Sequence, residues 1–308
     1  MKAIAIQRYG GPEVVEFMEL PDPKLDPDAV LVRVKAAGVN PADRHIREGT
    51  ADAVLEVRFP LVMGWDVAGV VERVGPAVTE YQVGDKVIGY VHKDWVQNGT
   101  FAELVACPVR TLARKPASLD WAQAGGLPLA GLTAYQGLHG ALAVKPGETV
   151  LIHSAAGGVG SMATQIAVAL GARVIGTASE HNHGYLRSLG AEPVAYGEGL
   201  ADRVRELAPQ GVDAAFDLVG GSAPEVSREL VADPGRIASI VDTAVVDHGG
   251  RYVWTRPDPA DLAALGELAD SGRLTVNVAA TFPLAQAASA QELLAERRTR
   301  GKIVLTVD

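Results

Sequence analysis

The chain has a single cysteine, Cys107, among its 308 residues. One cysteine excludes an internal disulfide and any cysteine-rich zinc site, because both need more than one thiol. Cys107 directly precedes Pro108 in an expected loop or strand end, and nothing suggests a histidine partner for it. We therefore expect a thiol that packs in the fold without reacting.

Positive charge and long apolar runs are also scarce. The formal net charge is −9, from 28 Lys and Arg against 37 Asp and Glu, whereas nucleic-acid binding needs clustered positive charge. No uninterrupted apolar span is long enough to cross a bilayer. The opening residues MKAIAIQRYG do not form a signal peptide, because their apolar run ends before Gln7. We expect a cytoplasmic protein that binds neither nucleic acid nor membrane.

The N-terminal third has the alternation that is typical of β-strands. In AVLVRVKAAGVN, Val30, Val32 and Val34 fall on one face of a strand, opposite Arg33 and Lys35. Glycine and proline turns separate the further runs DVAGVVERVG and GDKVIGYV. Residues 1 to about 115 therefore predict a β region.

Between Asp120 and Gly272, short apolar runs alternate with helical patterns. The apolar runs are TVLIH, ARVIGT, AEPVAY, VDAAFDLVG and GRIASIV. Such alternation needs crossover connections, and so it predicts a parallel sheet with helices on both faces. A last helical pattern then leads to the closing strand KIVLTVD. The pattern alone predicts a β region followed by a doubly wound α/β region.

The stretch TVLIHSAAGGVGSMATQIAVALGARVIGTAS resembles a turn that holds phosphates. It places Gly157, Gly158 and Gly160 between a strand pattern and a helical pattern, which is the context that a dinucleotide site requires. A helix that begins there would direct free N–H groups toward phosphates. Ala155 stands where a glycine would open the usual fingerprint. A tight glycine-rich turn in another α/β fold is the alternative interpretation.

The end of the second strand in this stretch carries no acidic residue. NAD-binding domains hold the ribose hydroxyls with a carboxylate at that position, and Ala178 occupies it here. Ser179 can donate a hydrogen bond to a 2′-phosphate, and His181 can add a donor or a charge. We therefore expect NADPH to be preferred over NADH, modestly, because no arginine fork is present.

Motifs with a specific order and spacing run through the whole chain. They are GVNPADRHIREG (38–49), GWDVAGVVERVG (64–75), VGDKVIG (83–89), GTFAELV (99–105), AGLTAYQGL (130–138), SAAGGVG (154–160), FDLVGG (216–221) and RGKIVL (300–305). Together they resemble the zinc-independent quinone oxidoreductase branch of the medium-chain dehydrogenase/reductase superfamily. The resemblance implies an α/β protein with a GroES-like β domain, residues 1–121 and 273–308. It also implies a Rossmann domain with a doubly wound parallel sheet, residues 122–272, a cleft at their junction, and a homodimer.

The sequence departs from the zinc alcohol dehydrogenases of the same superfamily at the metal ligands. Those enzymes have a cysteine after the AGV turn and a Gly-His-Glu in the next strand, where this chain has Asn40 and then Trp65-Asp66. The four-cysteine lobe is also missing. Because zinc needs three or four converging ligands, we expect no catalytic metal. Without a Lewis acid, we expect an acceptor that is already activated, namely a quinone or an α,β-unsaturated carbonyl.

The resemblance implies that Asn40, Asp43 and His45 form the catalytic set. For Asp43, a purely structural role in capping the turn is an equal alternative. His45 stands where many relatives have a tyrosine, and an imidazole can donate a proton or bond a developing oxyanion. The alternative for His45 is that it only lines the site while solvent supplies the proton.

The resemblance also implies which residues hold NADPH. They are Thr133, Ala156, Gly157, Gly158, Val159, Gly160, Ser179, His181, Tyr196, Val219 and Lys302. Tyr196 is expected near the adenosine end, whereas Thr133 could instead bond only to its own helix backbone. Three functions remain open at this stage: a reductase of quinones or enones, an enoyl reductase of one biosynthetic pathway, and a non-catalytic NADPH-binding protein.

Overall fold

The computed structural model describes residues 1–308, and the chain folds into two compact units. Unit 1 comprises Met1–Leu132, Arg256–Gly272 and Val276–Asp308, and unit 2 comprises Thr133–Thr255 and Arg273–Thr275. The sequence-based boundaries lie at 121/122 and 272/273. Helices that follow the first boundary and precede the second pack against strands of unit 1, so they belong to that unit by packing. The domain division at 121/122 and 272/273 stays a prediction.

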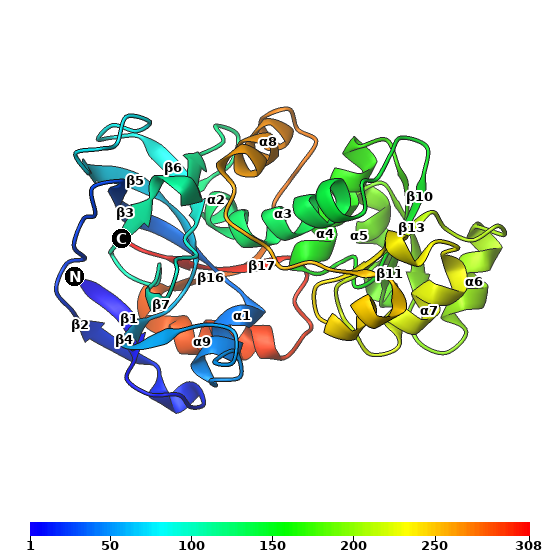
Figure 1. Cartoon of the computed structure of the whole chain (residues 1–308), viewed down its shortest axis with the longest axis horizontal. Coiled ribbons are helices and arrows are strands. Elements are labelled where there is room, and N and C mark those ends of the chain that lie inside the picture. Colours follow the sequence, from blue (N-terminus) through cyan, green and yellow to red (C-terminus); the bar gives the residue numbers. More distant parts are fainter. The chain divides into compact units, whose positions relative to one another are not determined.

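Unit 1 contains two β-sheets (Figure 1). Its strands are β1 (Lys2–Ile6), β2 (Glu16–Glu19), β3 (Ala29–Val39), β4 (Val57–Val62), β5 (Asp66–Val74), β6 (Lys86–Tyr90), β7 (Val96–Asn98), β8 (Leu104–Pro108), β9 (Leu112–Arg114), β16 (Val278–Pro283) and β17 (Lys302–Thr306). The smaller sheet has the order β2-β1-β4-β7, and the larger has the order β16-β17-β3-β5-β6-β9, with β8 paired to β3. The closing strand β17, red in Figure 1, lies antiparallel to the blue strand β3.

The alternating apolar residues of strand β3 lie in the buried core. Val30, Val32 and Val34 are fully buried, as the alternation predicts, while Arg33 is exposed and pairs with Glu72. The strand pairs with β17, β5 and β8. Three neighbours place it at the centre of the larger sheet, so that its end at Val39 is surrounded by other strand ends.

The helices of unit 1 are short and lie at strand ends and sheet faces. They are α1 (Pro41–Arg47), α2 (Trp121–Gly126), the first part of α3 (Pro128–Tyr135), α8 (Pro259–Asp270) and α9 (Ala287–Ala295), with 3-10 turns η1 (Pro12–Val14), η2 (Val109–Thr111) and η7 (Leu284–Gln286). Helix α1 follows β3 directly, and α9 packs against β16 and β17. No helix of the structure combines the length and the apolar character that a bilayer crossing needs.

Unit 2 is built on one parallel sheet of six strands. These are β10 (Thr149–Ile152), β11 (Arg173–Ala178), β12 (Ala191–Ala195), β13 (Ala214–Asp217), β14 (Ile237–Ser239) and β15 (Arg251–Tyr252). Their order is β12-β11-β10-β13-β14-β15, and each pair is parallel. This is the strand order of the doubly wound dinucleotide-binding fold, in which ligands bind where the order reverses, here between β10 and β13.

Helices cover the parallel sheet, as the alternating pattern predicts. They are α4 (Gly158–Ala169), α5 (His183–Ser188), α6 (Leu200–Leu207) and α7 (Ala223–Leu230), with 3-10 turns η4 (Glu180–Asn182), η5 (Pro234–Arg236) and η6 (Thr243–His248) and a π-helical segment η3 (Gln136–Ala141). Figure 1 shows α4 and the α6–α7 pair on opposite sides of the sheet. Leu151 and Ile175 from the sheet pack in one buried cluster with Val204 of α6 and Leu230 of α7.

Candidate active site and cofactor-binding turn

The glycine turn of unit 2 connects β10 with α4. The helix begins at Gly158 with Gly157 as its N-cap, so its first N–H groups border the turn. A Cβ on Gly160 would lie 2.2 Å from the carbonyl oxygen of Ser154 and 2.7 Å from the Cα of Ala155. A Cβ on Gly157 would meet Ser154 only at 3.4 and 3.5 Å. Gly160 is therefore required for packing the start of α4 against the turn after β10, whereas Gly157 leaves space for a ligand to approach the backbone.

The missing first glycine of the fingerprint causes no strain at its own position. The left-handed residue of this turn is Ser154, with φ of 55°, and Ala155 keeps ordinary angles. The Ser154 N–H donates to Thr177 Oγ1 at 3.0 Å, and the Ala155 N–H donates to Thr177 O at 2.9 Å. A left-handed non-glycine residue costs roughly 1–2 kcal/mol. Bonds to the end of β11 hold the turn in this conformation.

The residues after β11 present a hydroxyl and an imidazole, with the exposed carboxylate of Glu180 between them in the chain. Ala178 is the last residue of the strand, and the hydroxyl of Ser179 accepts from Asn182 Nδ2 at 3.3 Å. His181 Nε2 lies 3.4 Å from the same hydroxyl, and the His181 side chain is exposed. A hydroxyl and an imidazole side by side suit an anionic phosphate better than an acidic residue would.

The other residues predicted to hold a cofactor in unit 2 differ in exposure. Tyr196, directly after β12, and Val219, two residues after β13, are large and exposed, at 64% and 52%. Thr133 is buried, with its Oγ1 2.7 Å from Thr255 Oγ1. Ala156 is buried and Val159 is half-buried in the glycine turn. The assignment of these residues to a cofactor stays a prediction.

Three neighbouring strands of unit 1 bring a buried polar cluster together. Asn40 follows β3, Asp66 begins β5 and Lys302 begins β17. Lys302 Nζ donates to Val39 O at 3.2 Å and to Asn40 Oδ1, and it lies 3.8 Å from Asp66 Oδ2. Asn40 Nδ2 donates to Asp66 Oδ2 at 2.9 Å. Asp66 therefore has a structural hydrogen-bonding role in this cluster.

Burial shifts the ionisation of the charged groups in this cluster. It lowers the pKa of Lys302, against the opposing effect of Asp66 and Asp43. It raises the pKa of Asp66, although Lys302, Asn40 and the N–H of Leu129 oppose the change. Lys302 therefore acts as the counter-charge of Asp66. A direct contact between Lys302 and a cofactor stays a prediction.

Asp43 caps the turn that begins α1. Its Oδ2 accepts the backbone N–H of Asn40 at 2.8 Å, and the residue is 1% exposed. Burial raises its pKa to about 7, with a further increase from Asp66 and opposing effects from the Asn40 N–H and Lys302. Its Oδ1 is buried without a hydrogen-bond partner. The capping role is present in the structure, and a catalytic role for Asp43 stays a prediction.

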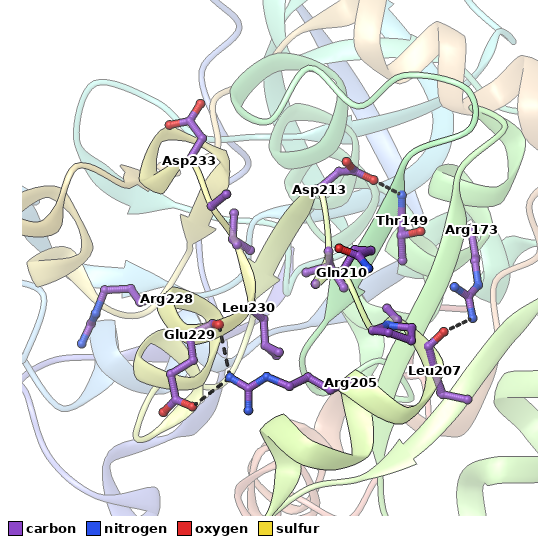
Figure 2. Close-up of a pocket in the computed structure, with 16 residues that line it drawn as sticks. Thr149, Arg173, Arg205, Leu207, Gln210, Asp213, Arg228, Glu229, Leu230 and Asp233 are labelled. Atoms are coloured by element: carbon purple, nitrogen blue, oxygen red, sulfur yellow. Dashed lines mark hydrogen bonds and ion pairs between the residues drawn. The ribbon is translucent and has the colours of Figure 1, made fainter.

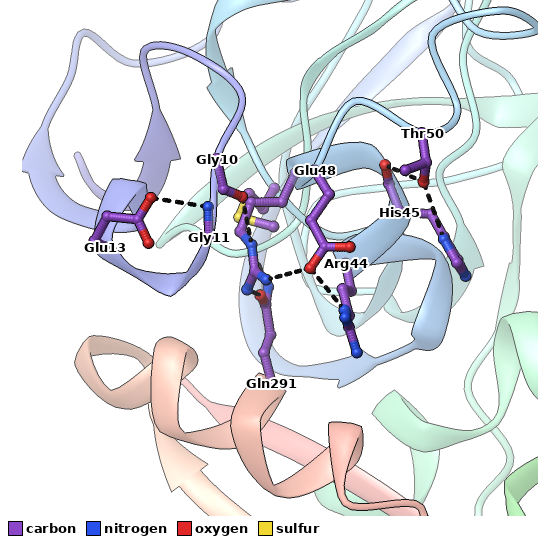
Figure 3. Close-up of polar contacts among 10 residues, drawn as sticks. Gly10, Gly11, Glu13, Arg44, His45, Glu48, Thr50 and Gln291 are labelled. Atoms are coloured by element: carbon purple, nitrogen blue, oxygen red, sulfur yellow. Dashed lines mark hydrogen bonds and ion pairs between the residues drawn. The ribbon is translucent and has the colours of Figure 1, made fainter.

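His45 lies on the exposed side of α1 and bonds to Thr50 (Figure 3). Thr50 Oγ1 donates to His45 O at 3.2 Å, and His45 Nδ1 lies 3.1 Å from the same Oγ1. Which atom donates in the bond between Nδ1 and Oγ1 depends on the tautomer of the ring. The other ring nitrogen, Nε2, is the atom of His45 that can meet a substrate.

A buried arginine fixes α1, and no sequence motif had pointed to it. Arg47 donates to Gly10 O at 3.3 Å, to Gln291 Oε1 on α9 at 2.5 Å and to Glu48 Oε1 at 3.2 Å. Figure 3 shows these groups meeting between the N-terminal loop, α1 and α9. The first two partners lie 37 and 244 residues away in the chain, so no local pattern could have revealed them.

A cavity in unit 2 contains none of the predicted site residues. It has a volume of about 880 Å³ and lies beside the amino end of β13, near Asp213 (Figure 2). Two of its arginines are already engaged: Arg173 with Glu192 and Leu207 O, and Arg205 with Asp202 and Glu229. Ligands of doubly wound folds bind at the opposite, carboxyl ends of the strands. We therefore assign no function to this cavity.

Two family models match parts of the chain. The alcohol dehydrogenase GroES-like domain matches residues 26–117, and the zinc-binding dehydrogenase model matches residues 189–305. A quinone oxidoreductase of Pseudomonas aeruginosa is 35% identical over 99% of this chain and 99% of its own length. The chain belongs to the quinone oxidoreductase branch of the medium-chain dehydrogenase/reductase superfamily.

Other members of the family are similar over the whole chain. The chloroplastic NADPH-dependent alkenal/one oxidoreductase of Arabidopsis thaliana is 34% identical, over 99% of this chain and 79% of its own length. A mycobacterial protein solved in complex with NADPH is 32% identical over all of both chains, with a TM-score of 0.87. The two units accordingly carry the GroES-like and Rossmann folds of this family.

The positions that hold zinc ligands in the zinc enzymes are occupied by other side chains. Asn40 and Asp66 are bonded to each other and to Lys302, and Trp65 is 6% exposed and packs against Tyr90 and His92. No three His, Cys, Asp or Glu side chains are grouped so that they could hold a metal ion. Independence from zinc stays a prediction.

Proposed function

We propose that the protein is an NADPH-dependent reductase that transfers a hydride to a quinone or an α,β-unsaturated carbonyl without zinc. One observation carries the proposal: the glycine turn of a doubly wound fold precedes a second strand that ends at Ala178, without a carboxylate. The names of the relatives, quinone oxidoreductase and NADPH-dependent alkenal/one oxidoreductase, support the same cofactor and acceptor class.

The side chains of unit 2 fit NADPH. Gly157 leaves the backbone open to a pyrophosphate at the start of α4. Ser179 and His181 supply donors for a 2′-phosphate, and Tyr196 offers an exposed ring for the adenine. Bound there, NADPH would supply the hydride, while the protein supplies binding, orientation and a proton.

His45 is proposed to assist with the proton. Reduction of a quinone or an enone places negative charge on an oxygen, which an imidazolium can bond or protonate. Thr50 engages Nδ1 and leaves Nε2 for this task. Asn40 and Asp43 would shape the start of α1 and thereby the position of His45, which lies on the same helix.

Independence from zinc follows from the residue types at the ligand positions. An amide at Asn40 and an indole at Trp65 replace a thiolate and an imidazole, and neither is a zinc ligand of the usual set. The internal cation Lys302 already satisfies Asp66 and Asn40. A carbonyl that is already activated by conjugation needs no Lewis acid, which favours quinones and enones over simple alcohols or ketones.

A homodimer that pairs through unit 2 is also proposed. The edge strand β15 has an unpaired side, and Val241, Val246 and Trp254 near it are 50%, 55% and 50% exposed. Exposed apolar groups beside a free strand edge are typical of an interface between copies. Light scattering after size exclusion would give twice the chain mass if this is correct. The cytoplasmic location stays a prediction.

An acceptor panel tests the proposed function. NADPH oxidation would be followed with small quinones, with α,β-unsaturated ketones and aldehydes, and with saturated aldehydes as controls. We expect turnover with quinones or enones and none with the saturated compounds. Turnover of only bulky acyl enones would favour an enoyl reductase of one pathway. Tight NADPH binding without turnover of any acceptor would instead indicate a non-catalytic NADPH-binding protein.

A further inference from the structure

A buried carboxylate lies at the carboxyl end of β13. Asp217 is 0% exposed, and its Oδ1 accepts the N–H groups of Val219 at 2.9 Å and Gly220 at 2.8 Å. Gly220 and Gly221 both have left-handed backbones, with φ of 71° and 64°. The carboxylate therefore holds a turn that glycine makes possible and that directs the exposed Val219 side chain outward.

The second oxygen of the same carboxylate holds a different loop. Asp217 Oδ2 accepts the hydroxyl proton of Ser239, the last residue of β14, at 2.7 Å. The Ser239 oxygen in turn accepts the N–H groups of Val241 at 3.2 Å and Asp242 at 2.9 Å. One carboxylate and one hydroxyl thus join the loops after two neighbouring strands into a single hydrogen-bonded unit.

These loops belong to one half of the doubly wound sheet. The other half, β10 to β12, contains the glycine turn. It also contains Ala178 and Ser179, at the position that lies beside the adenosine ribose in such folds. A dinucleotide bound across the reversal between β10 and β13 would therefore place its second nucleotide at the loops after β13 and β14. For NADPH that second nucleotide carries the nicotinamide.

We propose that Asp217 and Ser239 are positioning residues for the nicotinamide half of NADPH. They touch neither cofactor nor substrate themselves but keep residues 218–221 and 240–242 in one arrangement. The inference rests on the proposed NADPH-dependent function. It predicts that loss of the link weakens binding of the whole dinucleotide and leaves binding of its adenosine part unchanged.

The substitution Asp217→Asn separates the two tasks of the carboxylate. Its amide oxygen can still accept from Val219 and Gly220, so the first turn is kept. Its NH₂ group would face the Ser239 oxygen, which already accepts two N–H groups. The Ser239 hydroxyl would then have no acceptor for its proton. Ser239→Ala breaks the same link from the other side and leaves the bonds within the first turn in place.

The experiment compares two ligands on the full-length protein by calorimetric titration. The ligands are NADPH and 2′,5′-ADP, which has the adenosine part alone. We expect Asp217→Asn and Ser239→Ala each to raise the Kd of NADPH by about five- to twentyfold, because each variant loses a hydrogen bond to a charged group. The Kd of 2′,5′-ADP should stay within about twofold of its value in the unaltered protein. The double variant should bind NADPH no more weakly than the weaker single variant, because both changes break one link.

Asp213→Asn is the matched control. Asp213 lies at the opposite end of the same strand, where its Oδ2 accepts the Thr149 N–H at 2.7 Å (Figure 2), and this change should alter neither Kd. An equal loss for both ligands, or no loss for NADPH in either variant, would overturn the inference while the proposed function stands. Failure of the unaltered protein to bind NADPH at all would overturn the proposed function and this inference with it.

Discussion

At the scale of single residues, we propose His45 as the side chain that assists proton transfer. It lies on α1 with Nδ1 bonded to Thr50, so that Nε2 is available for an acceptor oxygen. We expect His45→Phe to lower kcat by about 10²-fold, the lower end of what a general acid contributes, and to leave the Kd of NADPH unchanged. The basic limb of the pH–rate profile should also disappear.

The control variant for His45→Phe is Thr50→Ser. It keeps the hydroxyl that bonds to His45 and should keep the pH–rate profile of the unaltered enzyme. If His45→Phe retains both the turnover and the pH profile of the unaltered enzyme, His45 only lines the site and solvent supplies the proton. Steady-state rates across the acidic, neutral and basic range, with one quinone and one enone, decide between these outcomes.

Ionisation of the Asp43 carboxyl should make the free energy of unfolding depend on pH. Its pKa is about 7 in the fold against an ordinary value of 3.8, so the folded state holds the proton more tightly and the free energy of unfolding falls as pH rises from about 4 to about 7. Asp43→Asn keeps an acceptor for the Asn40 N–H and cannot ionise. At a pH of about 8 its free energy of unfolding should exceed that of the unaltered protein by roughly 1–3 kcal/mol.

Urea unfolding at a pH of about 4.5 and a pH of about 8 measures this difference. At the lower pH the carboxyl of Asp43 is protonated in the fold, so the advantage of the variant should be smallest there. The exposed Asp28 provides the control, because Asp28→Asn should show no comparable gain between the two pH values. An advantage for Asp43→Asn that is equal at both pH values would contradict the assigned pKa.

At the scale of elements, the packing of α4 against the turn at Ser154 and Ala155, which follows β10, depends on Gly160. A Cβ there would lie 2.2 Å from Ser154 O, and both neighbours are backbone that cannot move aside cheaply. We expect Gly160→Ala to lower the free energy of unfolding by about 1–3 kcal/mol and to weaken NADPH binding. Gly184→Ala in α5 is the control, since nothing lies within 4 Å of its added Cβ; it should be neutral or stabilising. Equal unfolding curves for the two variants would rule out the close packing.

We propose that the residues at the end of β11 favour NADPH over NADH. Ser179 supplies a hydroxyl beside His181 in place of an acidic residue. We expect Ser179→Ala to lower kcat/KM for NADPH by about three- to tenfold, as for loss of one hydrogen bond to a charged group, and to leave kcat/KM for NADH unchanged. Rates with the two cofactors on one variant provide the internal control. A parallel loss with both cofactors would show that Ser179 does not contact the 2′-phosphate.

Elements with a local signal were predictable from the sequence. Strands β10 to β14 are apolar runs between turns, and the glycine turn directly follows β10 in the chain. The edge strand β15, Arg251–Tyr252, was not predicted, because two residues form no run. The cluster of Asn40, Asp66 and Lys302 was not predicted either, since Lys302 meets Asn40 across 262 residues of chain. Strand pairing, which no local pattern records, brings these three together.

At the scale of the whole molecule, the chain joins a GroES-like β fold to a doubly wound fold, and no three His, Cys, Asp or Glu side chains are grouped as a metal site. Lys302 provides an internal positive charge beside Asp66 and Asn40 instead. A fold of this family with these substitutions fits hydride transfer to acceptors that are activated by their own conjugation. We therefore propose a reductase that depends on NADPH and works without a metal.

The most direct test is the rate of NADPH oxidation by purified protein before and after exhaustive treatment with a chelator, with a quinone and an enone as acceptors. Elemental analysis of the same samples gives their zinc content. We predict turnover with at least one of these acceptors, a zinc content far below one ion per chain, and the same kcat in the treated sample. Stoichiometric zinc together with activity that is lost on its removal and restored by its return would contradict the claim.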